Sequence, residues 1–252
     1  MSSPDNHEGY ALLALTYAAA MQVVYKLGYA DLATLTTERV EWAATRSEDE
    51  LAVAAANFYR AGELIATFEW DAARGYLETA RDRIEYRLGD DVGKAMYGQL
   101  HLKSGLAAAR AGDPAATDAH IAEAADLASQ IGEFRNDYDL SFNRHNVNIW
   151  SVGLAVELMD GTKAVDRAHS MVIPRGVSTE RVGHHFIDLA RGYLLHGDKN
   201  KAFESLLTAR RIAPQQTKFH PQVIETARML ARSERRRSDT LSNFINWLDL
   251  IP

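Results

Sequence analysis

One stretch of the chain, residues 179–214, decides the fold, and it reads TERVGHHFIDLARGYLLHGDKNKAFESLLTARRIAP. Small and apolar residues recur at helical spacing on both sides of Gly197-Asp198, which predicts two antiparallel helices joined by a tight turn. Gly197 suits the left-handed end of the first helix, and Pro214 is expected to terminate the second. Small residues let the helices approach closely, and larger ones fill the remaining space. The small positions are Ala190, Ala202 and Ala209, and the large ones are Phe186, Leu189, Tyr193 and Leu206.

This pattern resembles one tetratricopeptide (TPR) repeat. Its three alanines lie 12 and 7 residues apart, and the same offsets return at other places in the chain. The resemblance implies an all-α fold, a TPR-like superhelix of antiparallel helical hairpins with a C-terminal capping helix. The other triplets are Ala61, Ala73 and Ala80; Gly105, Thr117 and Ala124; and Val152, Ala164 and Met171, where methionine replaces the last small residue.

The repeat length leaves two interpretations open. Equivalent positions of successive hairpins, Met21, Ala61, Gly105, Val152 and Ala190, are spaced by 40, 44, 47 and 38 residues. TPR repeats span about 34 residues and HEAT-like repeats about 40–47. We expect TPR-type hairpins with lengthened helices or connections, and a HEAT-like array is the alternative. The predicted organisation is a disordered leader over residues 1–9 and one repeat domain over 10–250, with hairpins at about 10–45, 48–88, 94–131, 142–173 and 180–213 and final helices at 222–237 and 239–250.

Composition bounds the class of protein. The chain has 252 residues, of which 46% are hydrophobic and 25% charged, as in ordinary globular proteins. It lacks a long apolar run, a signal peptide and any cysteine, so we expect a cytoplasmic protein without membrane contact, disulfides or thiolate chemistry. The formal net charge of -6 argues against indiscriminate binding of nucleic acid.

The final segment is unusually apolar for the end of a chain. Leu241, Phe244, Ile245, Trp247 and Leu248 recur at helical spacing there. A repeat array needs a terminal cap, which this helix would supply. The alternative interpretation is a contact in a homodimer, because an apolar surface of that size is seldom left exposed.

Polar residues on the predicted first helices are candidates for ligand contact, because first helices line the inner face of such an array. Asn57 and Arg60 share one face beside two aromatic residues. Arg144 and Asn146 lie in an asparagine-rich helix start, where an amide and a guanidinium would bind a short peptide or a small acidic ligand. Capping of the helix by Asn143 is the alternative explanation of that cluster.

His184 and Arg191 complete the candidate set, as groups that would contact an acidic ligand. Adjacent histidines at 184 and 185 point to different sides of a helix, and the chain has no HExxH motif, so we expect no metal and no cofactor. No nucleophile or acid–base pair suggests an enzyme. The arginines at 228, 232 and 235–237 favour a helix C-terminus over an arm that binds DNA.

The region from about Asp137 to Arg237 is similar to the C-terminal sensor region of actinobacterial-type helix-turn-helix (XRE-type) transcription regulators. The resemblance implies a sensing and dimerising domain, which reaches DNA only through a helix-turn-helix domain that we do not find in this chain. It is carried by Phe142 with Asn146-Val147, by Gly153-Leu154-Ala155-Val156-Glu157-Leu158 and Asp160, by Glu180-Arg181 and Asp188-Leu189-Ala190-Arg191, by Gly197-Asp198, by Ala209 with Ile212-Ala213-Pro214, and by His220-Pro221.

Two functions follow from these patterns. The first is a regulatory domain that senses a short peptide or small acidic ligand and forms a homodimer. The second is a TPR scaffold that joins proteins without any small ligand. Ligand contacts at Asn57, Arg60, Arg144, Asn146, His184 and Arg191 belong to the first.

Overall fold

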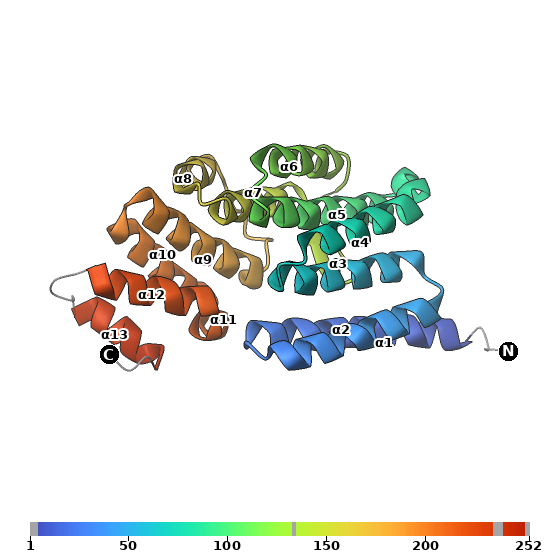
Figure 1. Cartoon of the computed structure of the whole chain (residues 1–252), viewed down its shortest axis with the longest axis horizontal. Coiled ribbons are helices and arrows are strands. Elements are labelled where there is room, and N and C mark those ends of the chain that lie inside the picture. The colour runs from blue at the N-terminus through green and yellow to red at the C-terminus, as the bar shows by residue number, and fades with distance from the viewer. Residues whose placement is uncertain (1–4, 133–134, 234–238, 250–252) are drawn as a thin grey trace. The chain divides into compact units, whose positions relative to one another are not determined.

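The computed structural model describes residues 5–132, 135–233 and 239–249 (Figure 1). These residues form thirteen α-helices, one short 3-10 helix and one two-stranded hairpin, which confirms the predicted all-α class. No described helix has the length and apolar character needed to cross a membrane. The helices are α1 (Asp5–Lys26), α2 (Ala30–Ser47), α3 (Glu50–Ala66), α4 (Trp70–Ile84), η1 (Glu85–Gly89), α5 (Asp91–Arg110), α6 (Pro114–Ser129), α7 (Arg144–Glu157), α8 (Gly161–His169), α9 (Thr179–His196), α10 (Lys199–Ile212), α11 (Pro214–Phe219), α12 (Pro221–Ser233) and α13 (Asp239–Trp247).

Contacts divide the described residues into two compact units. The first unit runs to Val147 without Lys26–Gly28, and the second contains Lys26–Gly28 and the chain from Asn148 onward. The region predicted as a single repeat domain, residues 10–250, thus contains parts of two compact units.

In the first unit, α3 packs against α2, α4 and α5, and α5 packs against α4 and α6. The small residues predicted at these contacts are fully buried. Ala61 of α3 faces its neighbours without exposed surface, as do Ala73 and Ala80 of α4 and Thr117 and Ala124 of α6. Alanine and threonine at these positions let helix backbones approach more closely than larger residues would allow.

In the second unit, α9 packs against α8, α10 and α12. Ala190, Ala202 and Ala209 are again fully buried, and Gly197 ends α9 in the left-handed conformation with φ 96°. The apolar side chains of α13 belong to the same core, which also contains Leu206 and Val223. This burial supports a cap for α13, because Leu241, Phe244, Ile245 and Leu248 are covered within the unit. The homodimer stays a prediction.

A short hairpin precedes α7 and was not predicted. Its strands, β1 (Arg135–Asp137) and β2 (Leu140–Phe142), pair antiparallel with Asp137 opposite Leu140. The two turn residues, Tyr138 and Asp139, both have positive φ, as a two-residue turn between twisted strands requires. Neither is glycine, so the turn costs conformational energy.

Contacts to neighbouring helices offset that cost. The Tyr138 hydroxyl donates to Asp49 Oδ2 at 2.5 Å, and the Gln22 amide donates to Asp139 Oδ2 at 2.7 Å. At the other end of the hairpin, the fully buried Phe142 ring lies on Gly98 of α5. A Cβ at Gly98 would stand 2.0 Å from Phe142 Cζ, so only glycine leaves room for the ring.

Two predictions about the chain require correction or restriction. Residues 5–9 belong to α1 and not to a disordered leader, and His7 Nδ1 lies 3.4 Å from Glu48 Oε2 of the first unit. Pro214 ends α10 as predicted and also begins α11, at a helix position where its missing N–H costs nothing. Residues 1–4, 234–238 and 250–252 lie outside the described part, as do the ends of both predicted final helices.

Gly98→Ala is expected to destabilise the chain by about 2–3 kcal/mol, because the added methyl displaces a buried aromatic ring. Thermal unfolding measured by circular dichroism would show a lower midpoint. Gly75→Ala is the matched control, since Gly75 lies on α4 with open space around it. That control should raise the midpoint, because alanine favours a helix by about 0.5–1 kcal/mol over glycine. Equal midpoints for the two variants would contradict the ring contact.

Candidate ligand site

The second unit contains a cluster of ionisable side chains on α9. His184, Asp188 and Arg191 follow one another at spacings of four and three residues, so they share one face of the helix. Asp188 is only 6% exposed. Its Oδ2 atom lies 3.5 Å from His184 Nε2, and its Oδ1 atom lies 3.6 Å from Arg191 Nη1. A carboxyl group is thus buried between an imidazole and a guanidinium.

Glu157 and His220 extend this arrangement to other elements. Arg191 Nη1 donates to Glu157 Oε1 at the end of α7, with a distance of 2.7 Å. The His184 ring centre lies 5.5 Å from that of His220, the residue before α12. We call Glu157, His184, Asp188, Arg191 and His220 the Asp188 cluster. It joins residues of α7 and α9 with His220, which lies between α11 and α12 of the second unit.

Gly153 of α7 provides the space for the Asp188 carboxyl group. A Cβ built at this glycine would lie 2.6 Å from Asp188 Oδ2, below any normal contact distance. A larger residue at position 153 would therefore push the carboxyl group out of its place. Because Gly153 has no side chain, α7 leaves room here for the Asp188 carboxyl group of α9.

Burial controls the protonation of the cluster. It raises the pKa of Asp188, although the charge of Arg191 acts in the opposite direction. Burial, together with neighbouring cations and against the charge of neighbouring carboxylates, lowers the pKa of His184 and of His220 to about 4. Both imidazoles are therefore neutral near pH 7, and each offers one N–H donor and one acceptor nitrogen.

The charge balance of the cluster favours a donor ligand over an acid. Arg191 Nη1 lies within ion-pair distance of both Glu157 and Asp188, so Arg191 already has its counter-charge. A ligand carboxylate would have to displace Glu157 and would meet Asp188. An amide N–H or an amine would instead find acceptor oxygens that have been partly removed from water.

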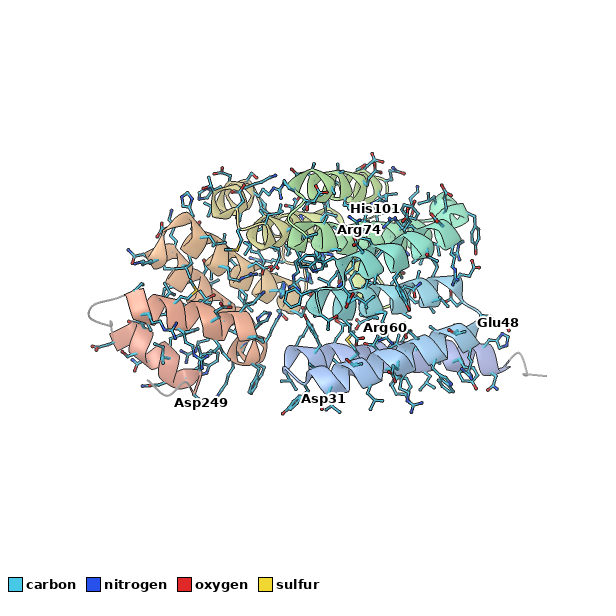
Figure 2. The ribbon with its side chains drawn as sticks, in the orientation of Figure 1. Asp31, Glu48, Arg60, Arg74, His101 and Asp249 are labelled. Atoms are coloured by element: carbon cyan, nitrogen blue, oxygen red, sulfur yellow. The ribbon has the colours of Figure 1, made fainter. Side chains whose placement is uncertain are left out.

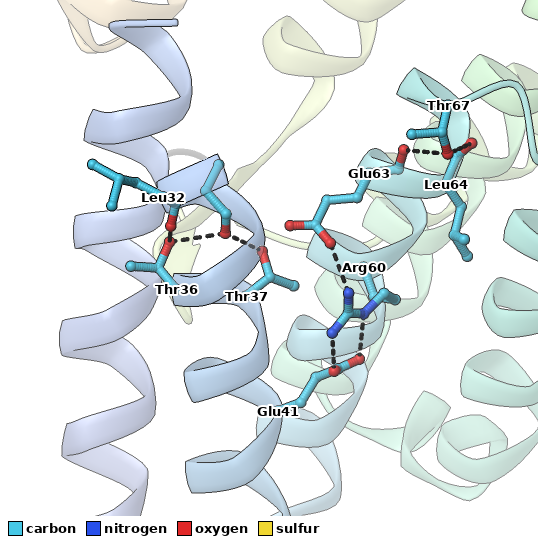
Figure 3. Close-up of polar contacts among 9 residues, drawn as sticks. Leu32, Thr36, Thr37, Glu41, Arg60, Glu63, Leu64 and Thr67 are labelled. Atoms are coloured by element: carbon cyan, nitrogen blue, oxygen red, sulfur yellow. Dashed lines mark hydrogen bonds and ion pairs between the residues drawn. The ribbon is translucent and has the colours of Figure 1, made fainter. Parts of the chain in front are cut away.

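Arg60, a second predicted contact, belongs to a separate ion network in the first unit (Figure 3). Its guanidinium binds Glu41 of α2 through two nitrogens, at 3.0 and 2.5 Å, and Glu63 of its own helix at 2.8 Å. The hydrogen bonds that Arg60 donates to Glu41 raise the Arg60 pKa and keep the side chain charged. This network joins α2 to α3, and a ligand would have to break it to reach Arg60.

Asn57 lies on the same helix but in different surroundings. It is half-buried and lines a cavity of about 180 Å³ with Glu50, Val53, Ala54, Ala80 and Arg83. Arg60 does not line this cavity. The structure therefore does not bring the two α3 residues together at one small pocket.

Asn146 and Arg144 lie at the start of α7. The Asn143 side chain accepts a hydrogen bond from the Asn146 backbone N–H at 2.9 Å, which is the geometry of a helix N-cap. The Asn146 amide in turn donates to the Ser141 carbonyl of β2, and Asn146 is buried. These contacts support the capping explanation of the asparagine cluster. Arg144 is exposed to solvent.

The last sequence predictions to compare with the structure concern metal-binding groups and the arginines near the C-terminus. Within residues 5–132, 135–233 and 239–249, no group of three or more histidine, aspartate or glutamate side chains is arranged to hold a metal ion. Arg228 and Arg232 are exposed on α12, and the arginines at 235–237 lie outside the described residues. Two of the six predicted contacts, His184 and Arg191, thus share one cluster.

Comparison with protein-family models, with curated proteins and with solved structures finds no match to this chain. The class of protein that the structure itself defines is an all-α helical protein with a buried ionisable cluster on α9.

Sequence reasoning missed Glu157, Asp188 and His220 as site residues. A signal was present, because Asp188 lies between two apolar residues of a core helix, where an acid is rarely placed without a partner. Its spacing to His184 and Arg191 indicated the same face. The contribution of Glu157 and His220 depends on tertiary contacts and has no local signal.

Arg60→Ala is expected to destabilise the chain by about 2–3 kcal/mol, because it leaves two carboxylates side by side without a cation. Urea unfolding would measure the change. Asp71→Ala is the control, since it removes a solvent-exposed pair with Arg74 on α4 and should cost less than about 1 kcal/mol. A loss no larger than that of the control would contradict a structural role for the network.

Acidification from pH 7 toward pH 5 is expected to lower the unfolding midpoint. His185 is 3% exposed, and burial lowers its pKa to about 4, below the value of about 6.5 of an unfolded histidine. The unfolded chain therefore binds protons that the folded chain does not. The stability is complete above about pH 6.5 and is lost as the pH falls toward 4.

His185→Leu should remove up to about one of the protons that the chain takes up on unfolding in this pH range, and the midpoint should then depend less on pH. His169→Leu, which changes an exposed residue of α8, should leave it unchanged. Asp188 acts in the opposite direction, because its raised pKa lets the folded chain bind a proton earlier than the unfolded chain. A midpoint that is independent of pH between 7 and 5 in the wild type would contradict the burial of neutral histidines.

Proposed function

We propose that this chain is the ligand-sensing domain of a TPR-like transcription regulator, and that the Asp188 cluster is its ligand site. One observation carries the proposal: a carboxyl group is buried beside an arginine and two neutral histidines, at a place where α7, α9 and the start of α12 meet. Buried ionisable groups with shifted pKa values are concentrated at functional sites. Regulation of DNA would pass through a separate helix-turn-helix domain.

The resemblance to XRE-type regulators supports this assignment in an independent way. Gly153 and Glu157 of α7, Asp188 and Arg191 of α9, and His220 are among the residues that carry the resemblance. Four of these five residues belong to the Asp188 cluster, and Gly153 makes room for it. Residues shared for helix packing alone would not be expected to converge on one polar cluster.

The chemistry of the cluster supports a short peptide as the ligand, with an amino, guanidinium or amide N–H group directed at Asp188 and Glu157. Such a group would find acceptor oxygens on both carboxyl groups, which lie on either side of Arg191. A small acidic ligand would lose the Arg191–Glu157 contact and is therefore less well supported. The histidines would provide further hydrogen bonds in their neutral forms.

Binding at this cluster would act on the spacing of helical elements. Glu157 ends α7, Arg191 belongs to α9, and His220 precedes α12, so one ligand can contact three elements of the second unit. A ligand shifts the conformational equilibrium only by the difference in its affinity for the two states. The proposed signal is a change in the packing of these elements, transmitted to a homodimer partner or DNA-binding domain.

A TPR scaffold without a small ligand is the alternative. It would require a protein partner with a buried interface above about 1,000 Å².

The test is binding to an array of tetrapeptides that differ in having basic, neutral or acidic side chains. The wild-type chain should retain basic peptides over acidic ones. Asp188→Asn should weaken that binding by at least about tenfold, the expected loss of one charge-assisted hydrogen bond. Asp166→Asn, on the exposed side of α8, is the matched control and should bind as the wild type does.

Preference for acidic peptides, or equal losses in both variants, would remove the Asp188 cluster from the proposal. Absence of peptide binding would favour the scaffold, and native mass spectrometry of the wild-type chain would then look for a bound protein partner. The same spectra would give the oligomeric state and so test the predicted homodimer.

A further inference from the structure

A second polar cluster lies in the first unit, on α4, α5 and α6. Tyr97, His101 and Ser104 of α5 are spaced by four and three residues and share one face. Arg81 of α4 donates from Nη1 to Ser104 Oγ at 2.6 Å. On the α6 side, His101 Nδ1 lies 3.0 Å from His120 Nδ1. Three consecutive helices thus contribute donors to one place.

Arg81 has an unusual environment for a guanidinium. It is half-buried, and its one hydrogen bond goes to the neutral Ser104 hydroxyl. Among the described residues, no carboxylate forms an ion pair with it. The acids that act on it, Glu78 and Asp82, are exposed residues of its own helix. Burial lowers the Arg81 pKa, which reflects the cost of removing a cation from water without a counter-charge.

This arrangement differs from that of two other half-buried arginines, Arg60 and Arg191. Arg60 is bound by two carboxylates, and Arg191 likewise faces Glu157 and Asp188. Arg81 is held at a similar depth against a hydroxyl group only. A buried charge normally needs a partner, and no carboxylate in the described part of the chain supplies one for Arg81.

The histidine pair beside Arg81 has a matching chemistry. Burial and the charge of Arg81 lower the pKa of His101 to about 3, and they lower that of His120 as well. In the neutral pair one Nδ1–H donates to the other Nδ1, which leaves one Nε2–H donor and one Nε2 acceptor. Monohydrogen phosphate can satisfy both, because it accepts through its oxygens and donates through its O–H.

We propose that Arg81, Ser104, His101 and His120 form a binding site for a phosphate group. Its negative charge would neutralise Arg81, and the imidazoles would complete its hydrogen bonds. The charge of Arg74 on α4 also acts on His120, and the exposed pair of Arg74 with Asp71 is weak enough to be released. Figure 2 labels Arg74 and His101. The phosphate would be free or carried by a small molecule, since the same donors recognise both.

Several other groups act on this site and must be considered in any titration. Burial raises the pKa of Tyr97, and Arg81 opposes that shift. Asp113 at the N-cap of α6 raises the pKa of His120. The remaining acids that act on Tyr97 are Asp82, Glu85 and Glu123.

The proposal is tested by nuclear magnetic resonance of the full chain, with inorganic phosphate and methyl phosphate as probes. Both should shift the His101 and His120 imidazole signals, and the phosphate charge should move their titration toward higher pH. Arg81→Gln should weaken binding of both probes by at least about tenfold. Arg83→Gln, an exposed change two residues along α4, is the matched control and should leave binding intact.

The unfolding midpoint provides a second readout that does not depend on the imidazole signals. Phosphate should raise the midpoint of the wild type but not that of Arg81→Met. Without phosphate, Arg81→Met should be at least as stable as the wild type, because it removes a desolvated cation that lacks a counter-charge. Binding of inorganic phosphate but not of methyl phosphate would assign the site to the free ion, and binding of both would assign it to phosphate esters as well.

Four outcomes would overturn the proposal: no response to either probe, binding that survives Arg81→Gln, a strong loss of stability in Arg81→Met without phosphate, or imidazole shifts with Zn²⁺ alone. The last outcome would identify a two-histidine metal site instead. None of these outcomes depends on the peptide array, so the phosphate site and the proposed sensor function stand or fall separately.

Discussion

Close approach of helix backbones is the constraint on which the rest of this structure depends. Fully buried alanines at the helix contacts, Ala61 and Ala73 in the first unit and Ala190 and Ala202 in the second, leave no room for solvent between neighbouring helices. Small residues give little apolar area each, so larger ones such as Leu77 and Leu206 supply the burial that stabilises the contacts. Any polar side chain on these faces is therefore removed from water and must find a partner within the protein.

The two units meet that requirement in different ways. Arg60 is neutralised by Glu41 and Glu63, and these ion pairs connect α2 to α3. In the Asp188 cluster, Arg191 lies within ion-pair distance of two carboxyl groups, Glu157 and Asp188. Arg81 is a half-buried cation whose hydrogen bond goes to a neutral hydroxyl group, that of Ser104. Desolvation by the same kind of helix packing thus gives three distinct chemical environments.

Much of the helical framework was accessible from local patterns. Triplets of small residues predicted which positions would be buried, and Gly197 predicted the end of α9. The hairpin before α7 was missed, because its turn contains Tyr138 and Asp139 in place of the usual asparagine and glycine. That turn is held by contacts to Asp49 and Gln22, which are distant in sequence and leave no local signal.

The sequence by itself determined the all-α class and the small residues at the helix contacts, because both follow from helical periodicity and side-chain size. It also determined that His184 and Arg191 share a helix face, since spacing alone decides this. Only the tertiary structure decided which charges meet: that Glu41 neutralises Arg60, that Glu157 neutralises Arg191, and that Arg81 meets a hydroxyl group and a histidine pair. Electrostatic partners are set by distances of a few ångströms between different helices, and a linear pattern does not contain those distances.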